Sequence, residues 1–186
     1  IKYTSKIYRG KFNHRPRNDP DYYDGKYPFI QTGDVANSGM YISKYTQTLN
    51  EKGYSVSKEF PKGTLVMTIA ANIGDIAILN FNACFPDSIV GFIPNKFMDL
   101  KYMYYTYSIM KDEFMSTAII NTQMNLNIER IENLSITVPS IDIQNIIVKY
   151  IEQKVNSIES IINKTKLQIE KLKEAKQSLI SEAVTG

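Results

Sequence analysis

No proline or glycine occurs between Pro139 and Gly186, so nothing in residues 140–186 interrupts a single continuous helix. Mostly apolar side chains recur there at alternating spacings of four and three residues, the heptad pattern of a coiled coil. This seam consists of Ile151, Val155, Ile158, Ile162, Thr165, Ile169, Leu172, Lys176, Leu179 and Ala183. At about 1.5 Å per residue the seam is roughly 48 Å long, more than a helix needs to cover a small domain. The pattern predicts that a second helix packs against it.

The alternative is a long helix that packs along its own domain. Charges of both signs lie outside the seam, as on a solvated helix face. Thr165 and Lys176 weaken the seam locally, and such polar positions can set register or partner choice. The pattern does not distinguish parallel from antiparallel pairing.

The rest of the chain predicts one α+β domain over residues 1–139, followed by the dimerisation or spacer helix at 140–186. Turn residues separate four short apolar or β-branched runs at 64–69, 75–79, 84–85 and 89–93, which predict a small antiparallel or mixed sheet that curls on itself. Additional strands are expected at 27–32 and 134–138. Asp99 is a suitable N-cap for a helix over residues 100–115, and 128–131 should form a helical turn. Residues 8–25 and 117–127 are expected to be irregular loops.

Positive charge is concentrated near the N-terminus. Residues 1–58 hold ten of the 22 Lys and Arg residues but five of the 19 Asp and Glu residues. Six of these cations precede the first acid, Asp19, and form a possible phosphate-contact surface. An ordinary solvated segment is the alternative, because the net charge is only +3.

The composition argues against several enzyme classes. A single cysteine, Cys84, and a single histidine, His14, form no zinc cluster and no internal disulfide, which favours an intracellular, cytoplasmic protein without a metal of its own. No glycine-rich phosphate cradle surrounds the turns at Gly33 and Gly74. Asp87 followed by Asp99 and Lys101 matches the loose pattern of a metal-dependent nuclease, which stays as an alternative.

The remaining polar inventory suits nucleic acid. The loop around His14 mixes cations with amides, and further amide side chains sit in turns between elements. Arginine pairs naturally with guanine, and asparagine or glutamine with adenine, in the major groove of DNA. A second alternative is a non-DNA scaffold in which the coiled coil joins protein partners.

Five stretches of the chain form an ordered series. They are Gly10-Lys11-Phe12 through Pro20 with Tyr27-Pro28-Phe29-Ile30-Gln31-Thr32-Gly33-Asp34-Val35; Ala71-Asn72-Ile73-Gly74-Asp75-Ile76-Ala77-Ile78-Leu79; Asn121-Thr122-Gln123-Met124-Asn125-Leu126-Asn127; Ile136-Thr137-Val138-Pro139 running into Gln144; and Lys176 through Gly186 at the end of the helix. Together they resemble a known family, the DNA-specificity subunits of type I restriction-modification enzymes. No single motif is decisive, but their order and their connection to a coiled-coil helix are specific.

The resemblance implies a non-catalytic target recognition domain that reads one half of a bipartite DNA target. It implies docking onto modification subunits that bind S-adenosylmethionine and restriction subunits that use ATP and Mg²⁺. Family members usually carry two recognition domains and two antiparallel helices. One domain and one helix, without the tryptophan that often precedes such a domain, therefore suggest half a subunit that pairs with a second copy or a second half.

The resemblance also implies site residues. Phosphate contacts are expected from Lys6, Arg9, Lys11, Arg15, Arg17 and Lys44. Base contacts, which carry the sequence information, are expected from His14, Asn18, Gln31, Asn72 and Gln123. The expected helix interface is Ile151, Val155, Ile158, Ile162, Thr165, Ile169, Leu172, Leu179 and Ala183.

Overall fold

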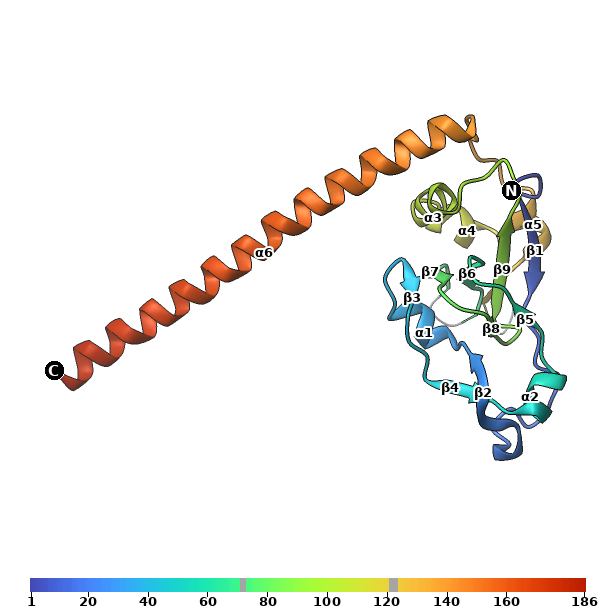
Figure 1. The fold of residues 1–186 in the computed structure, drawn as a ribbon, viewed down its shortest axis with the longest axis horizontal. Helices are drawn as coiled ribbons and strands as arrows, with labels where there is room; N and C mark the ends of the chain where they lie inside the picture. Colours follow the sequence, from blue (N-terminus) through green and yellow to red (C-terminus); the bar gives the residue numbers. More distant parts are fainter. Residues whose placement is uncertain (71–72, 121–123) are drawn as a thin grey trace. The chain divides into compact units, whose positions relative to one another are not determined.

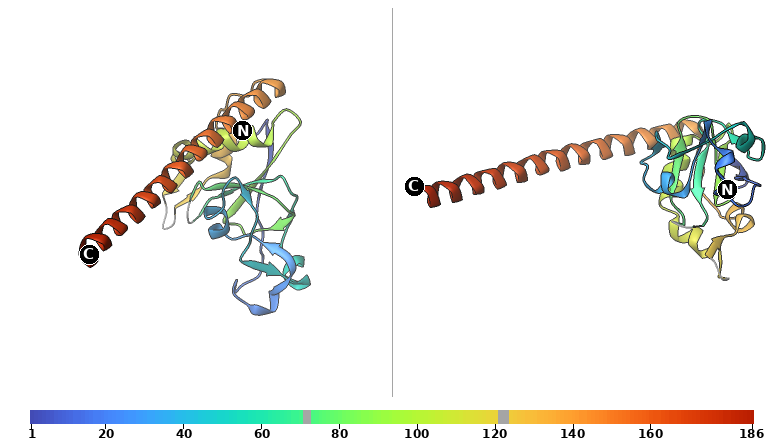
Figure 2. Two further views of the ribbon diagram at one scale, coloured as in Figure 1. Left: turned by 60° about the vertical axis from the view of Figure 1, so that its left-hand side comes forward. Right: turned by 90° about the horizontal axis from the view of Figure 1, so that it is seen from below.

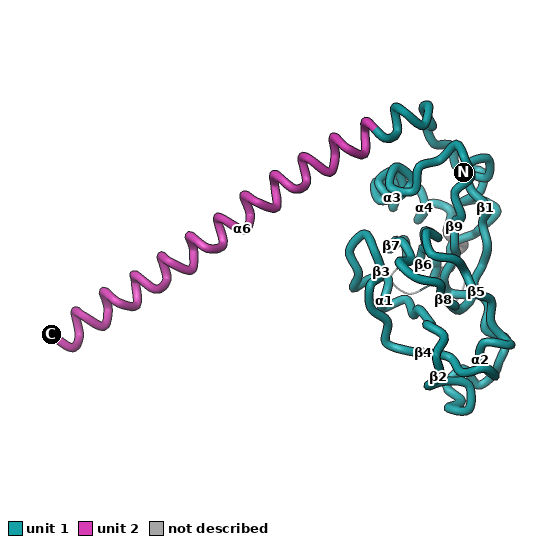
Figure 3. The backbone as a smooth tube through the Cα atoms, in the orientation of Figure 1, with its two compact units in different colours: residues 1–145 teal, residues 146–186 magenta. Residues whose placement is uncertain are grey.

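A computed structural model describes residues 1–70, 73–120 and 124–186 of the chain. Two compact units are distinguished by their internal contacts, residues 1–145 and residues 146–186 (Figure 3). The first unit combines two small mixed sheets with short helices, which confirms the predicted α+β class. The second unit consists of the greater part of one helix.

The larger sheet has five strands in the order β1-β9-β6-β7-β3. Its strands are β1 (Ser5–Arg9), β9 (Ile89–Pro94), β6 (Leu65–Thr68), β7 (Ile76–Leu79) and β3 (Tyr41–Ile42). Neighbouring strands are antiparallel except for β3, which runs parallel to β7.

The smaller sheet has the order β4-β2-β8-β5. Its strands are β4 (Gln47–Leu49), β2 (Tyr23–Phe29), β8 (Ala83–Cys84) and β5 (Glu59–Phe60). The parallel β2–β8 contact pairs Phe29 with Cys84. The four runs expected to form one sheet are therefore divided, because β8 joins β2 while the other three join β1 and β3.

Helices cover one side of the larger sheet. They are α3 (Leu100–Ser108), α4 (Lys111–Ser116) and α5 (Ile128–Glu132), and Figure 1 shows them at the end of the unit opposite β2, β4 and α2 (Glu51–Ser55). Met67 of β6 packs in the core beneath these helices, while its neighbour Val66 packs in the core on the other face. Burial on both faces explains why this strand has an uninterrupted apolar run.

Several local predictions were wrong. The helix expected over 100–115 is two helices, because the chain turns at Ile109 and Met110 and so brings Tyr107 and Phe114 into one core. Leu134 and Ile136 pack on the core with the alternation of a strand, but residues 134–138 have no neighbouring strand and are not a β-strand.

Residues 117–127, expected to be a loop, contain the hairpin of β10 (Ala118–Ile120) and β11 (Met124–Leu126). The amide-rich composition concealed it. Similarly, β2 begins earlier than expected, at Tyr23, and Thr32 opens the short helix α1 (Thr32–Ala36) instead of ending a strand.

The long helix is α6 (Ile141–Thr185), 45 residues without a break, as all three ribbon views show (Figures 1 and 2). Every residue from 153 to 186 is exposed in the single chain, including all seam residues in that range. An isolated helix usually needs an apolar face buried against another element to be stable. The exposed stripe is therefore available to a partner.

Burial makes the first unit sensitive to alkali. Burial, with a smaller contribution from the Glu59 charge, raises the pKa of the Cys84 thiol from 9.0 to about 12. Burial also raises the pKa of the Tyr107 hydroxyl from 10.0 to about 12. Because the folded chain keeps both protons at pH values where the unfolded chain loses them, we expect the free energy of unfolding to fall as pH rises from 9.0 towards about 12.

Chemical denaturation across this pH range measures the effect, and Cys84→Ala combined with Tyr107→Phe should flatten the slope. A parent chain whose unfolding midpoint stays constant over the range would contradict the prediction.

Candidate nucleic-acid interface

The basic loop after β1 is fixed at its base by backbone hydrogen bonds. Gly10 N donates to Ile89 O and Lys11 N to Phe85 O, each at 2.9 Å. Next along the chain, Phe12 is buried among aromatic rings between the loop and the smaller sheet. The loop therefore starts from a defined position although it lacks regular structure.

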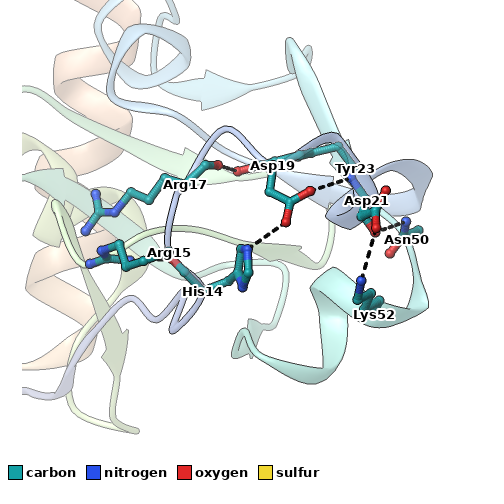
Figure 4. Close-up of polar contacts among 8 residues, drawn as sticks. All are labelled: His14, Arg15, Arg17, Asp19, Asp21, Tyr23, Asn50 and Lys52. Atoms are coloured by element: carbon teal, nitrogen blue, oxygen red, sulfur yellow. Dashed lines mark hydrogen bonds and ion pairs between the residues drawn. The ribbon is translucent and has the colours of Figure 1, made fainter.

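Contacts within the loop hold His14. Its ring stacks on Tyr22 with centroids 3.7 Å apart. Its Nε2 lies 2.9 Å from Oδ2 of Asp19, a contact drawn as a dashed line in Figure 4. The backbone N–H of Asp21 and then the His14 side chain hold the pKa of the Asp19 carboxyl below its usual value. His14 was expected to contact bases, and that role stays a prediction. The geometry shows a side chain that closes the loop.

The far side of the loop is attached to α2. The 3-10 helix Pro20–Tyr22 carries Asp21, whose carbonyl accepts from the Asn50 amide at 3.0 Å and whose carboxylate lies 3.4 Å from Lys52 Nζ. Lys52 Nζ also lies 4.5 Å from the ring centroid of Tyr22. These contacts connect the loop to the element that follows β4.

Three of the expected phosphate-binding residues gather at Asp87. Arg9 Nε donates to its carbonyl oxygen at 2.7 Å, and Arg15 and Arg17 form ion pairs with its carboxylate. The side chains of Arg15 and Arg17 are 58% and 43% exposed, respectively. Figure 4 shows them side by side, pointing away from His14. One carboxylate thus orders several cations on an accessible surface.

Two other expected residues, Gln31 and Lys44, lie together at a second place. Both line a hollow of about 650 Å³, which we call the α1 hollow. Its remaining lining comes from parts of residues 33–39 and 41–46. Gln31 precedes α1, and Asp34 in the first turn of that helix accepts the Gln31 N–H at 2.8 Å.

The other residues expected to contact DNA are either dispersed over the surface or lie outside the residues that the structure describes. Lys6, Lys11 and Asn18 are exposed. Asn72 and Gln123 lie outside the described residues. Sequence reasoning missed Tyr45 and Gln47, which only the return of the chain through β4 brings beside Gln31; no local motif marks them.

The residues of the nuclease alternative have other roles. Asp87 is paired with arginines, and Asp99 caps α3 by accepting the Tyr102 N–H at 2.8 Å. Within residues 1–70, 73–120 and 124–186, no group of three or more His, Cys, Asp or Glu side chains could hold a metal ion. In that same part of the chain, no helix is both long enough and apolar enough to span a lipid bilayer.

The described residues thus combine an anchored basic loop, two mixed sheets and one long helix. A family model for the type I restriction modification DNA specificity domain matches residues 9–171, and the chain belongs to that family. Among curated proteins, the type I restriction enzyme MjaIX specificity subunit of Methanocaldococcus jannaschii is 31% identical over 90 residues, covering 47% of this chain and 21% of that subunit.

Solved structures have the same fold at low sequence identity. A chain from a study of assembly and conformational transition of the type I R-M system has a TM-score of 0.70 at 18% identity, covering 93% of this chain and 42% of that one. The HsdS subunit of Thermoanaerobacter tengcongensis gives 0.64 at 15% identity, covering 86% and 37%. The S subunit of M. genitalium gives 0.58 at 17% identity, covering 86% and 38%. The chain thus spans about two fifths of these structures.

Proposed function

We propose that the chain is a non-catalytic specificity subunit, or half of one, that binds one half of a bipartite target in double-stranded DNA. It acts in the cytoplasm and directs a methyltransferase subunit that uses S-adenosylmethionine and an endonuclease subunit that uses ATP and Mg²⁺. Membership of the specificity-domain family supports this role. The observation that carries it in this chain is the ordered, exposed cluster of Arg9, Arg15 and Arg17 beside an anchored loop.

The cluster has the properties of a phosphate-contact surface. Arginine retains its charge, and its planar donor set matches phosphate oxygens. Asp87 holds the side chains in position but is itself exposed, so incoming phosphates can compete for the guanidinium groups. Exposed ion pairs contribute little to folding stability, so this exchange costs little.

The helix role follows from the exposed seam. Ile151, Val155, Ile158, Ile162, Thr165, Ile169, Leu172, Leu179 and Ala183 bury against the helix of a second copy or a second half, and the opposite face is left for the modification subunit. The scaffold alternative explains this seam equally well, but it gives no reason for the arginine cluster. DNA binding therefore distinguishes the two hypotheses.

The test is binding of the full chain to a pool of randomised duplexes at several salt concentrations. We expect Arg15→Ala with Arg17→Ala to weaken binding and to reduce the salt slope by about 1.8, since each neutralised phosphate contributes about 0.9. The control, Lys164→Ala with Lys171→Ala, removes the same charge from α6 and should leave the slope unchanged. An equal slope for the parent and the arginine variant would exclude this loop as the contact surface.

Asp87→Asn separates the DNA-reading role from the nuclease alternative. Removing the carboxylate frees Arg17 and removes repulsion towards phosphate, while Arg15 keeps its hydrogen bonds to the Phe12 and His14 carbonyls, so binding should persist or strengthen. If instead the parent chain cleaves DNA with Mg²⁺ and Asp87→Asn abolishes cleavage, the non-catalytic assignment is wrong.

A further inference from the structure

The walls of the α1 hollow are held in place by internal hydrogen bonds. The Asp34 carboxylate accepts from the Gln31 N–H at 2.8 Å, from the Thr46 N–H at 3.2 Å and from the Thr46 hydroxyl at 3.3 Å. On the helix side, the Asn37 amide donates to Gly33 O at 2.9 Å. Asp34 thus joins α1 to the segment that enters β4, and three donors surround its negative charge.

Gln31 is oriented by a second glutamine. Its Nε2 donates to Oε1 of Gln47 at 2.8 Å. Gln47 is the first residue of β4 and lies opposite Phe29 of β2, so it is fixed by a strand pair. A side chain held by a residue on a regular element is better positioned than one on a free loop.

The remaining hydrogen-bonding capacity of Gln31 matches one base. A glutamine amide has two N–H donors and a carbonyl oxygen with two lone pairs. The bond to Gln47 uses one N–H, and the capping box of α1 brings the Gln31 amide oxygen to the Asp34 backbone N–H, so one N–H and one oxygen lone pair are left for a ligand. Adenine presents an N7 acceptor and an N6 donor in the major groove, the complementary pair.

The rim of the hollow suits the backbone of the same duplex. Lys44 is exposed there and provides a cation for a phosphate. Tyr45 is 43% exposed, and its ring is supported edge-on by Phe81, with centroids 5.3 Å apart. A supported, half-exposed aromatic ring can pack against sugar or base without losing much conformational freedom.

We infer that the α1 hollow is a base-reading subsite for an adenine in duplex DNA, with Gln31 as the reader and Gln47 as the residue that positions it. The inference rests on the proposed function and assigns one base of the half-site to one pair of side chains. Gln47 is a positioning residue because it acts through Gln31.

The test is selection of duplexes from a randomised pool by the full chain, with sequencing of the bound fraction. The parent chain should select a motif that contains an adenine, and the preference for adenine at that position should require Gln31. Gln31→Ala should lower the preference for that adenine by about 5- to 150-fold, the range for one bidentate contact, and leave the other positions unchanged. Gln31→Lys should shift the preference at that position from adenine to guanine, which lysine reads.

The Gln47 variants test the positioning role. Gln47→Leu removes the acceptor and should reduce the preference at the same position. Gln47→Glu keeps an acceptor oxygen and should retain the preference, even if its added charge lowers affinity. A general loss of folding would weaken every position together, so a change confined to one position separates positioning from a structural role.

Other outcomes are equally clear. If the parent chain selects no motif, the proposed function fails. If it selects a motif that Gln31→Ala and Gln31→Lys leave unchanged, the proposed function stands and the subsite is wrong. If the Gln31 variants alter one position but Gln47→Leu does not, the positioning role of Gln47 is wrong.

Discussion

Replacing Ile158 and Ile162 together with lysine is expected to convert the associated chain into monomers. The two side chains are adjacent seam residues of α6 and are 56% and 45% exposed in the single chain. Burying an isoleucine contributes about 1.5 kcal/mol or more, so losing four in a dimer should weaken association by about 10⁴-fold. Lysine also places four charges in an apolar interface, which adds to the effect.

Sedimentation velocity over a range of chain concentrations measures this change. The matched control, Gln153→Lys with Ser160→Lys, adds the same charge on the opposite face of the helix and should leave the associated species intact. Both variants should keep the unfolding temperature of residues 1–145, since the substitutions lie outside that unit. If the Ile158 and Ile162 variant sediments like the parent, the seam is not the interface.

Gly10→Ala is expected to destabilise residues 1–145 and to weaken the proposed DNA binding. A Cβ at this position would lie closer than 3.0 Å to the carbonyl oxygen of Pro86 and to the ring of Phe85. These are backbone and core atoms that cannot move aside freely, so the loop base must shift and its 2.9 Å hydrogen bonds to Ile89 and Phe85 must break. Forced overpacking of this kind costs about 1–3 kcal/mol, and we expect the upper part of this range.

The control is Gly39→Ala, where an added Cβ would meet nothing within 4 Å and no unusual φ is required. Its stability should change by less than about 0.5 kcal/mol. Thermal unfolding of both variants gives the comparison of stability. Binding to the randomised duplex pool is compared between Gly10→Ala and the parent chain, because Gly39 lines the α1 hollow. Equal unfolding temperatures for the two variants would show that the loop base tolerates a side chain.

The sequence predicted the features that depend on neighbouring residues. The long helix follows from the heptad spacing and the absence of proline and glycine, and the strands around Met67, Ile78 and Phe92 follow from apolar runs bounded by turns. Each of these signals is local, so the pattern alone was sufficient.

Features that depend on contacts between distant residues could not be predicted. The separation of β8 from its sequence neighbours depends on pairing with Phe29, which lies 55 residues before Cys84. The same limit applies to the candidate site. The sequence suggested Gln31 and the arginines by residue type, but the organising partners Gln47 and Asp87 approach them only in the folded chain.

The two sheets are interleaved along the sequence, and this restricts how such a domain can diversify. The chain passes from the larger sheet at β1 to the smaller at β2, returns for β3, and changes sheet again at β4, β6, β8 and β9. Any crossover between relatives after β2 and before β8, within residues 30–82, would therefore combine strands of different parentage in both sheets at once. Genetic exchange should preserve folding best when all strands from β1 to β9 are inherited together. New specificities are therefore expected to arise by replacement of this whole segment or by point changes on its surface.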